Sequence, residues 1–354
     1  MAKIPMPSVA LKTILEKAWS GARMSRSNLR YLLSIDEHSE FSTYIRQSAS
    51  MLTRLWTENS AAILGSVGIE ISPCPGGCKF CSFGYGHTQF TPYQMDEAAL
   101  TRKIQEFCAF DDLYGLVLVT MHHYDTQYLL RMTQHALDTV PPGTQVWLNI
   151  GDSDPGFLRE VAGMGVEGIY HVCRLREGID TELNPRDRIA TMVSAKEAGL
   201  KVFTCCEPIG PEHTLDELVE NIFLSIDLGL DINAAMPRVA VPGSPMAHLG
   251  MLSPARLAHI VACITLAFCS VGRPFMMVHE PLAEALQCGA NLLMAESGAN
   301  PRDHEAETTG NRGFDLTRCR QMLFDAGFAY LRRGNMRKIP LTQEYLEKTS
   351  DILV

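Results

Sequence analysis

The feature that most constrains this fold is an alternation, from Gly65 to about residue 300, of short apolar runs with longer segments of helical periodicity. Turns rich in Gly, Pro and Asp separate the two kinds of segment, so we expect short strands and helices in succession. The eight predicted strands are Val67–Ser72, Gly115–Thr120, Gln145–Ile150, Gly168–Cys173, Leu200–Cys206, Asp231–Val239, Pro274–Val278 and Ala290–Ala295. Strands that each lead into a helix pair in parallel through right-handed crossovers. The sequence therefore predicts an α/β fold, a closed (β/α)8 barrel of the TIM type.

Helical patterns fill the intervals between these strands and extend the chain at both ends. The predicted barrel helices are Glu97–Phe107, Thr126–Thr139, Pro155–Met164, Pro185–Ala198, Thr214–Leu228, Pro254–Cys269 and Pro281–Gln287. Before the barrel, Val9 to Trp19 and Phe41 to Trp56 have helical periodicity, and Ser25 is a suitable N-cap for the segment between them. A further helix is expected from Leu316. We therefore expect N-terminal helices over residues 1–60, the barrel over 61–310 and a short C-terminal helical extension over 311–354.

The charge of the chain argues against two classes of partner. Its 31 Lys and Arg stand against 40 Asp and Glu, a net charge of −9, and the basic residues are scattered. Nucleic acids and anionic membranes attract clustered basic residues, so we expect neither as a partner. The longest apolar stretch, Ile260–Cys269, is too short to span a bilayer, and Met1 to Pro7 lack the regions of a signal peptide. These features favour a cytoplasmic protein.

Three cysteines follow the first predicted strand, in the segment Cys74-Pro-Gly-Gly-Cys78-Lys-Phe-Cys81. A barrel enzyme carries its active-site loops at the C-terminal ends of its strands, which is where this cysteine loop (residues 74–81) falls. Its two glycines let the backbone wrap tightly and bring N–H groups near a polynuclear ion. Thiolates are the usual protein ligands of iron–sulfur clusters, and three of them leave one iron of a 4Fe-4S cluster open to an external ligand.

Two other functions remain compatible with these cysteines. A closed zinc site needs a fourth cysteine or histidine, and His87 could supply it in a zinc-dependent hydrolase or lyase. The sequence has no second C-x2-C pair, and the adjacent Cys205 and Cys206 would point to opposite faces of a strand. The other alternative is a carrier that binds a cluster without turning over a cosubstrate. Most of the remaining cysteines lie in apolar segments, where we expect them to pack as small hydrophobic residues.

The C-x3-C-x2-C spacing, with Phe80 before its last cysteine, resembles the motif of the radical S-adenosylmethionine (SAM) superfamily. Four further segments, in order along the chain, resemble the biotin synthase-like branch, and its HydE, PylB and HmdB members more than biotin synthase itself. These segments are Trp147–Asp152, Asn184–Arg188, Val241–Met246 and Gly289–Ala295. The resemblance extends from about residue 10 to residue 330.

The resemblance implies a 4Fe-4S cluster held by Cys74, Cys78 and Cys81, with SAM bound to the open iron through its amine and carboxylate. Reduction of the bound SAM would give a 5′-deoxyadenosyl radical, and a flavodoxin or ferredoxin would supply the electron. The cofactors that it implies are therefore the 4Fe-4S cluster and SAM.

It also implies residues that bind the cofactor. The predicted set is Phe80, Thr120, Asn149, Arg174 and Arg188. Phe80 would lie beside adenine, and Arg188 would hold the SAM carboxylate through its planar guanidinium, unless it is a surface residue in a salt bridge. Arg174 would contact SAM at the end of the fourth strand, where a shift of register would give this role to Glu177 or His171.

Titratable residues at other predicted strand ends are candidates for contact with the substrate. His122 and His123 follow the second strand and Glu207 ends the fifth, and we predict these three as catalytic acid–base groups. Each could instead have a structural hydrogen bond or ion pair. Arg238 and His279 are also placed at the barrel mouth. Because unpaired buried charges are costly, this set favours a small polar substrate.

One departure from the family narrows the function. Biotin synthase holds a second cluster in its barrel, and at the aligned strand ends this chain has Trp147, Phe203 and His279 instead. We therefore expect a single-cluster enzyme and not biotin synthesis. Its substrate would be a small polar molecule or a metallocofactor precursor. The expected reactions are a rearrangement, C–C or C–S bond chemistry, or a step of cofactor maturation.

Overall fold

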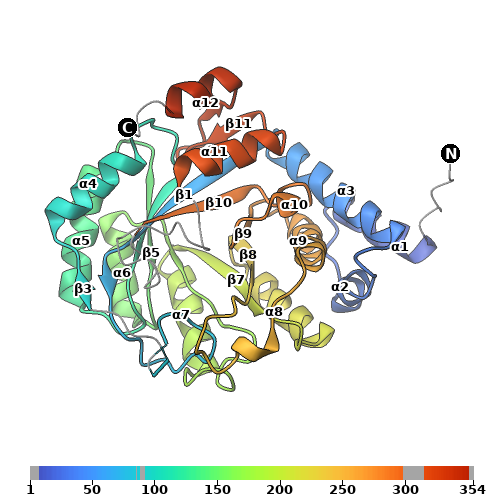
Figure 1. Cartoon of the computed structure of the whole chain (residues 1–354), viewed down its shortest axis with the longest axis horizontal. Helices are drawn as coiled ribbons and strands as arrows, with labels where there is room; N and C mark the ends of the chain where they lie inside the picture. The colour runs from blue at the N-terminus through green and yellow to red at the C-terminus, as the bar shows by residue number, and fades with distance from the viewer. Residues whose placement is uncertain (1–7, 85, 88–91, 298–314, 351–354) are drawn as a thin grey trace.

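The structure, a computed structural model, describes residues 8–350 apart from residues 85, 88–91 and 298–314. Within this part of the chain, eight parallel strands form a barrel, which closes because the last strand pairs with the first (Figure 1). In spatial order they are β1 (Ser60–Gly68), β4 (Gly115–Val119), β5 (Gln145–Asn149), β6 (Gly168–Tyr170), β7 (Lys201–Ile209), β8 (Ile232–Pro237), β9 (Met276–Val278) and β10 (Leu292–Ser297). The predicted (β/α)8 barrel is confirmed.

The outer helices begin where the sequence provides caps. They are α4 (Glu97–Phe107), α5 (Thr126–Thr139), α6 (Pro155–Met164), α7 (Pro185–Glu197), α8 (Leu215–Asp227), α9 (Pro254–Cys269) and α10 (Ala283–Leu286). The residue before each of α4 to α9 is Asp, Asn, Ser or Thr, and its side chain accepts a hydrogen bond from a backbone N–H of the first turn. These caps explain why the predicted starts of α4 to α9 agree with the structure to within one residue.

The first strand was predicted in the wrong place. It was expected over Val67–Ser72, but β1 begins at Ser60 and ends at Gly68. Every residue of β1 is buried, as in parallel strands covered on both faces, so small residues such as Ala61 and Ala62 occupy it without an alternating pattern. The residues that follow form a hairpin of β2 (Glu70–Ile71) with β3 (Tyr93–Gln94). This hairpin brings together the two ends of the segment that contains the cysteine loop.

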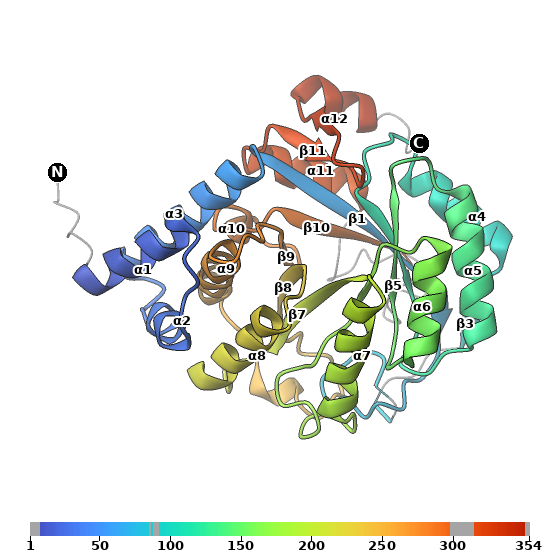
Figure 2. The ribbon, with the colours of Figure 1, turned by 180° about the vertical axis from the view of Figure 1, so that it is seen from behind.

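Three N-terminal helices cover one side of the barrel, against α8 and α9 (Figure 2). They are α1 (Val9–Ser20), α2 (Arg26–Leu33) and α3 (Glu40–Trp56). From Leu257 to its end at Cys269, α9 is buried on all sides, as expected for a helix that is apolar all round. Ion pairs of Arg26 with Glu220 and of Arg30 with Asp216 connect α2 to α8. In the part of the chain that the structure describes, we find no helix with the length and apolar character needed to cross a membrane.

The C-terminal segment is not entirely helical, contrary to expectation. It contains α11 (Leu316–Asp325), β11 (Tyr330–Arg332), β12 (Lys338–Pro340) and α12 (Gln343–Ser350). The hairpin of β11 and β12 extends the sheet, because β11 pairs in parallel with the start of β1. Strands of three residues are too short to show an alternating pattern. The expected boundary at residue 310 lies outside the described residues, and the division into three parts stays a prediction.

Candidate functional site

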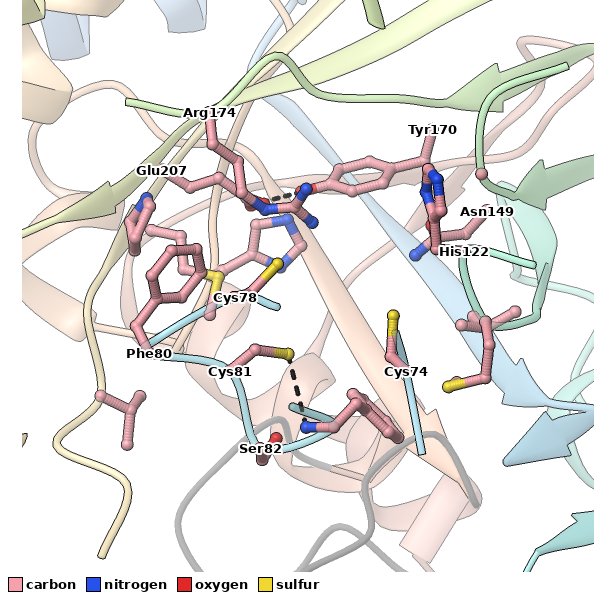
Figure 3. A pocket seen from close by; sticks show the side chains of 18 of the residues that line it. Cys74, Cys78, Phe80, Cys81, Ser82, His122, Asn149, Tyr170, Arg174 and Glu207 are labelled. Atoms are coloured by element: carbon pink, nitrogen blue, oxygen red, sulfur yellow. Dashed lines mark hydrogen bonds and ion pairs between the residues drawn. The ribbon is translucent and has the colours of Figure 1, made fainter. Parts of the chain in front are cut away.

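A cavity of about 210 Å³ opens at the C-terminal ends of the barrel strands (Figure 3). Of the residues predicted for the site, all except His123 line this cavity: Cys74, Cys78, Phe80, Cys81, Thr120, His122, Asn149, Arg174, Arg188 and Glu207. They come from the cysteine loop, from the ends of four strands and, for Arg188, from α7. Because parallel strands point the same way, residues distant in sequence meet at this one end of the barrel.

The cysteine loop is closed by its own backbone hydrogen bonds. The Cys74 N–H donates to the carbonyl of Phe83 at 2.9 Å, and the Cys81 N–H donates to that of Cys78 at 3.3 Å. The Phe83 N–H donates to the sulfur of Cys81 at 3.4 Å. The three cysteines lie around one shared space (Figure 3). The loop therefore presents three sulfur donors to the same part of the cavity.

Gly77 is needed for this loop conformation. Its φ of +60° lies in the left-handed region, which residues with a side chain rarely adopt. A Cβ at this position would also lie 2.5 Å from Cγ of Glu182. The loop can therefore approach the segment after β6 only with glycine here, as the sequence motif predicted.

The guanidinium of Arg174 affects the pKa of Cys78 in the cysteine loop. Burial raises the pKa of Cys78 to about 12, and the Arg174 guanidinium opposes this rise. A metal ion removes the proton of a ligating thiol outright, and a nearby cation helps the thiolate to form. Arg174 thus lies where it can stabilise negative charge at the cysteine loop.

Arg174, which is partly buried, pairs with a polar group formed by the buried Glu207 and Tyr170. Its Nε lies 3.1 Å from Oε1 of Glu207, and the Tyr170 hydroxyl donates to Oε2 of the same carboxylate at 2.7 Å. Burial alone would raise the pKa of Glu207, but the charges of Arg174 and His279 outweigh it and lower this pKa below its usual value. Glu207 is therefore a charged carboxylate with both oxygens engaged.

A second buried group surrounds Asp152. Nη1 of Arg188 lies 2.9 Å from Oδ1 of Asp152, and Nε2 of His171 lies 3.2 Å from the same oxygen. Burial would raise the pKa of Asp152, but His171 and Arg188 lower it to about 2. Arg188 is 4% exposed, so it is a buried cation on α7 and not a surface residue. Arg188 Nε also donates to the carbonyl of Val172 at 2.9 Å.

The two predicted histidines differ in position. His122 lines the cavity, and its Nε2 lies 3.7 Å from Oδ2 of Asp152. Burial and the charge of Arg188 lower the pKa of His122 to about 4, so it is neutral at pH 7. His123 is exposed and does not line the cavity. His122 and His123 lie in a bend after β4 with their ring centroids 4.8 Å apart, and of the two only His122 lines the cavity.

Sequence reasoning missed Tyr170 and Asp152 as members of the site. Tyr170 lay inside a predicted strand, Gly168–Cys173, but β6 ends at Tyr170 itself, which places its side chain at the cavity. Asp152 was part of a segment that resembled the family, and no role was predicted for it. Had the fourth strand been predicted to end at Tyr170, this residue would have been placed among those at the cavity.

The cavity is lined by both polar and apolar groups. Glu207, Tyr170 and Asn149 contribute polar groups, whereas Val119, Met236 and Met294 contribute apolar surface. Deeper in the barrel, Trp147 and Phe203 are fully buried in the interior cluster, and Phe203 stacks on His279 with ring centroids 6.2 Å apart.

The donor set fits an iron–sulfur cluster. Three sulfurs from one loop share a space beside the partly buried guanidinium of Arg174, and thiolates are the preferred ligands of such clusters. His87, considered as a fourth zinc ligand, has its Nε2 2.7 Å from the carbonyl oxygen of Cys81. Among the residues that the structure describes, no three His, Cys, Asp or Glu side chains are grouped as ligands of one metal ion.

Comparison with known proteins shows the fold. No protein-family model matches the sequence, and a search of curated proteins gives no match. The structure is similar to methylornithine synthase (PylB), with a TM-score of 0.76 and 15% identity over 89% of this chain and 96% of that one. It is also similar to HydG, a maturase of the [FeFe]-hydrogenase, with a TM-score of 0.76 and 14% identity over 92% of this chain and 76% of that one. HydG from Carboxydothermus hydrogenoformans has a TM-score of 0.73 at 14% identity over 92% of this chain and 80% of that one.

Proposed function

We propose that this chain is a radical SAM enzyme of the biotin synthase-like branch, with a 4Fe-4S cluster held by Cys74, Cys78 and Cys81. The observation that carries the proposal is the convergence of these three thiols on one cavity, at the end of the barrel where such enzymes place their chemistry. The similarity in fold to PylB, one of the proteins that the sequence resembles, supports it. When bound, the cluster would supply the electron that cleaves SAM to a 5′-deoxyadenosyl radical.

The residues of this chain would bind and orient SAM. Phe80 would lie beside adenine, and the guanidinium groups of Arg174 and Arg188 would hold the carboxylate. Thr120 and Asn149 would contribute hydrogen-bonding groups at the ends of β4 and β5. His122 faces the same cavity and would contact bound molecules as a neutral imidazole, able to accept or donate a proton.

We propose a small substrate with both polar and apolar parts. Tyr170 and Asn149 would face its polar groups, and Met236, Met294 and Val119 would face its apolar part. One structural neighbour is named for methylornithine synthesis and another for hydrogenase maturation. An amino-acid-sized molecule or a metallocofactor precursor is therefore the class that we propose. The reaction would be a rearrangement, C–C or C–S bond chemistry, or cofactor maturation, with a flavodoxin or ferredoxin as electron donor.

Anaerobic reconstitution with iron and sulfide tests this proposal. We expect a brown protein with about four irons per chain, and 5′-deoxyadenosine when SAM and dithionite are added. Cys78→Ala should abolish both properties. Cys288→Ala is a matched control, because Cys288 is buried and does not line the cavity, and it should retain both.

The same experiment distinguishes the alternatives. A colourless protein with one bound zinc would favour a zinc-dependent hydrolase or lyase. A cluster without 5′-deoxyadenosine would favour a carrier that does not turn over SAM. Iron binding that survives Cys78→Ala would overturn the assignment of the ligands.

A further inference from the structure

Glu207 was predicted as a catalytic acid–base group, but its surroundings indicate another role. One carboxylate oxygen is paired with Arg174 Nε and the other accepts the hydrogen bond of Tyr170, and the residue is 6% exposed. A general base needs an oxygen that can reach the substrate. Both oxygens of Glu207 are instead engaged within the protein.

The partners of Glu207 are themselves fixed. The Tyr170 ring packs edge-on against Phe203 at 4.8 Å and against His279 at 5.7 Å between centroids, which directs its hydroxyl to Glu207. The backbone adds a second link, because the Leu175 N–H donates to the carbonyl of Glu207 at 2.8 Å. The end of β7 therefore holds the segment that carries Arg174 by its backbone and by its side chain.

Arg174 extends from this anchor to the cysteine loop. Arg174 and Cys78 line the same cavity, and the Arg174 guanidinium lies beside the Glu207 carboxylate (Figure 3). A second carboxylate, Glu177, lies 3.9 Å from Arg174 Nη1. The pair with Glu207 is thus the shorter of the two ion pairs that hold the guanidinium.

We propose that Glu207 is a positioning residue that fixes the Arg174 guanidinium beside the cysteine loop, so that this charge raises the reduction potential of the cluster bound there. The inference rests on the proposed function, since it requires a cluster on the three cysteines. Reduction adds one electron and hence one negative charge to the cluster. A fixed cation in a low-dielectric site stabilises the more negative state. Net charge and hydrogen bonding around a cluster are known determinants of its potential.

The test is the midpoint potential of the reconstituted protein without SAM, from a dithionite titration followed by electron paramagnetic resonance. Arg174→Gln removes the cation and should lower the potential. Glu207→Ala removes the anchor and should also lower it, although it deletes a negative charge. The midpoint potential of the double variant should not lie below that of Arg174→Gln alone, because both substitutions remove the effect of the same positioned guanidinium.

A matched control is Glu217→Gln. It breaks the ion pair, at 2.6 Å, between Glu217 on α8 and Arg176 in the segment after β6, and neither residue lines the cavity. The potential of this control should equal that of the unmodified protein. Circular dichroism and iron content would be measured for every variant.

The sign of the shift decides the question. If Glu207→Ala raises the potential, the residue acts as a simple negative charge and the positioning role is overturned. An unchanged potential in Arg174→Gln would overturn the role of the cation. If Glu207→Ala does not fold or bind iron, Tyr170→Phe decides instead: it should lower the potential by a smaller amount, and an unchanged value overturns the proposal. Failure of the unmodified protein to bind a cluster would refute the proposed function itself.

Discussion

The ion pair between Asp112 and Arg320 should be a main support of the C-terminal segment. Arg320, on α11, contacts the carboxylate of Asp112, just before β4, through Nε at 2.6 Å and Nη2 at 3.0 Å. Both side chains are 1% exposed, and the hydroxyl of Tyr345 on α12 donates to the same carboxylate at 2.9 Å. One carboxylate therefore connects both C-terminal helices to the barrel.

Asp112→Ala should destabilise the protein strongly. It leaves the Arg320 guanidinium buried without this partner, which costs about 3–5 kcal/mol. The lost Tyr345 hydrogen bond adds about 1 kcal/mol. We expect a loss of about 4 kcal/mol or more in the free energy of unfolding, measured by urea denaturation at pH 7 and followed by circular dichroism.

The control for this prediction is Lys338→Ala. Lys338, on β12, pairs with Glu58 at the surface, where the two side chains are 31% and 68% exposed. Exposed ion pairs contribute about 0–1 kcal/mol, so this variant should be nearly as stable as the unmodified protein. An Asp112→Ala variant no less stable than Lys338→Ala would refute the reasoning.

Two further predictions concern pH and the shape of the cavity. Burial lowers the pKa of His259 to about 4, below an unfolded value near 6.5, so the stability that it contributes is complete above pH 6.5 and is lost as the pH falls toward 4. Between pH 7 and pH 5, the free energy of unfolding should therefore fall by about 2 kcal/mol more in the unmodified protein than in His259→Gln. An equal fall in the two proteins would contradict this. At Gly151 a Cβ would lie 1.8 Å from the carbonyl oxygen of His122, so Gly151→Ala should displace the cavity wall and lower the rate of 5′-deoxyadenosine formation on the order of 100-fold. Gly163→Ala, where a Cβ meets no atom within 4 Å, should retain the full rate, and equal rates in the two variants would contradict the prediction.

The sequence predicted the outer helices better than the first strand, for a physical reason. Helix starts depend on local caps such as Asp96 and Asp125, which can be recognised within a few residues. The position of β1 depends instead on burial by distant segments, and its small residues carry little propensity of their own. The hairpin of β11 and β12 was missed for the same reason, since its pairing with β1 is not encoded locally.

The candidate site shows the same distinction. The cysteine loop was recognisable because its three cysteines and two glycines lie within eight residues. The contacts of Glu207 are with Tyr170 and Arg174, which come from other elements, so sequence position alone could not show that its carboxylate is paired. His123 was predicted together with His122, but of these two adjacent residues only His122 lines the cavity, and the catalytic role of either stays a prediction.

The pairing of β1 on both sides has a consequence for the order of events during synthesis. Ser60 of β1 pairs with Tyr330 of β11, and Ala62 pairs with Leu292 of β10. At a translation rate of about 5–20 residues per second, β10 and β11 are synthesised roughly 15 to 50 s after β1, and one edge of β1 is unpaired during this time. An open parallel strand edge is a template for association with other chains. The N-terminal half of this protein should therefore depend on chaperones while the ribosome completes the remainder.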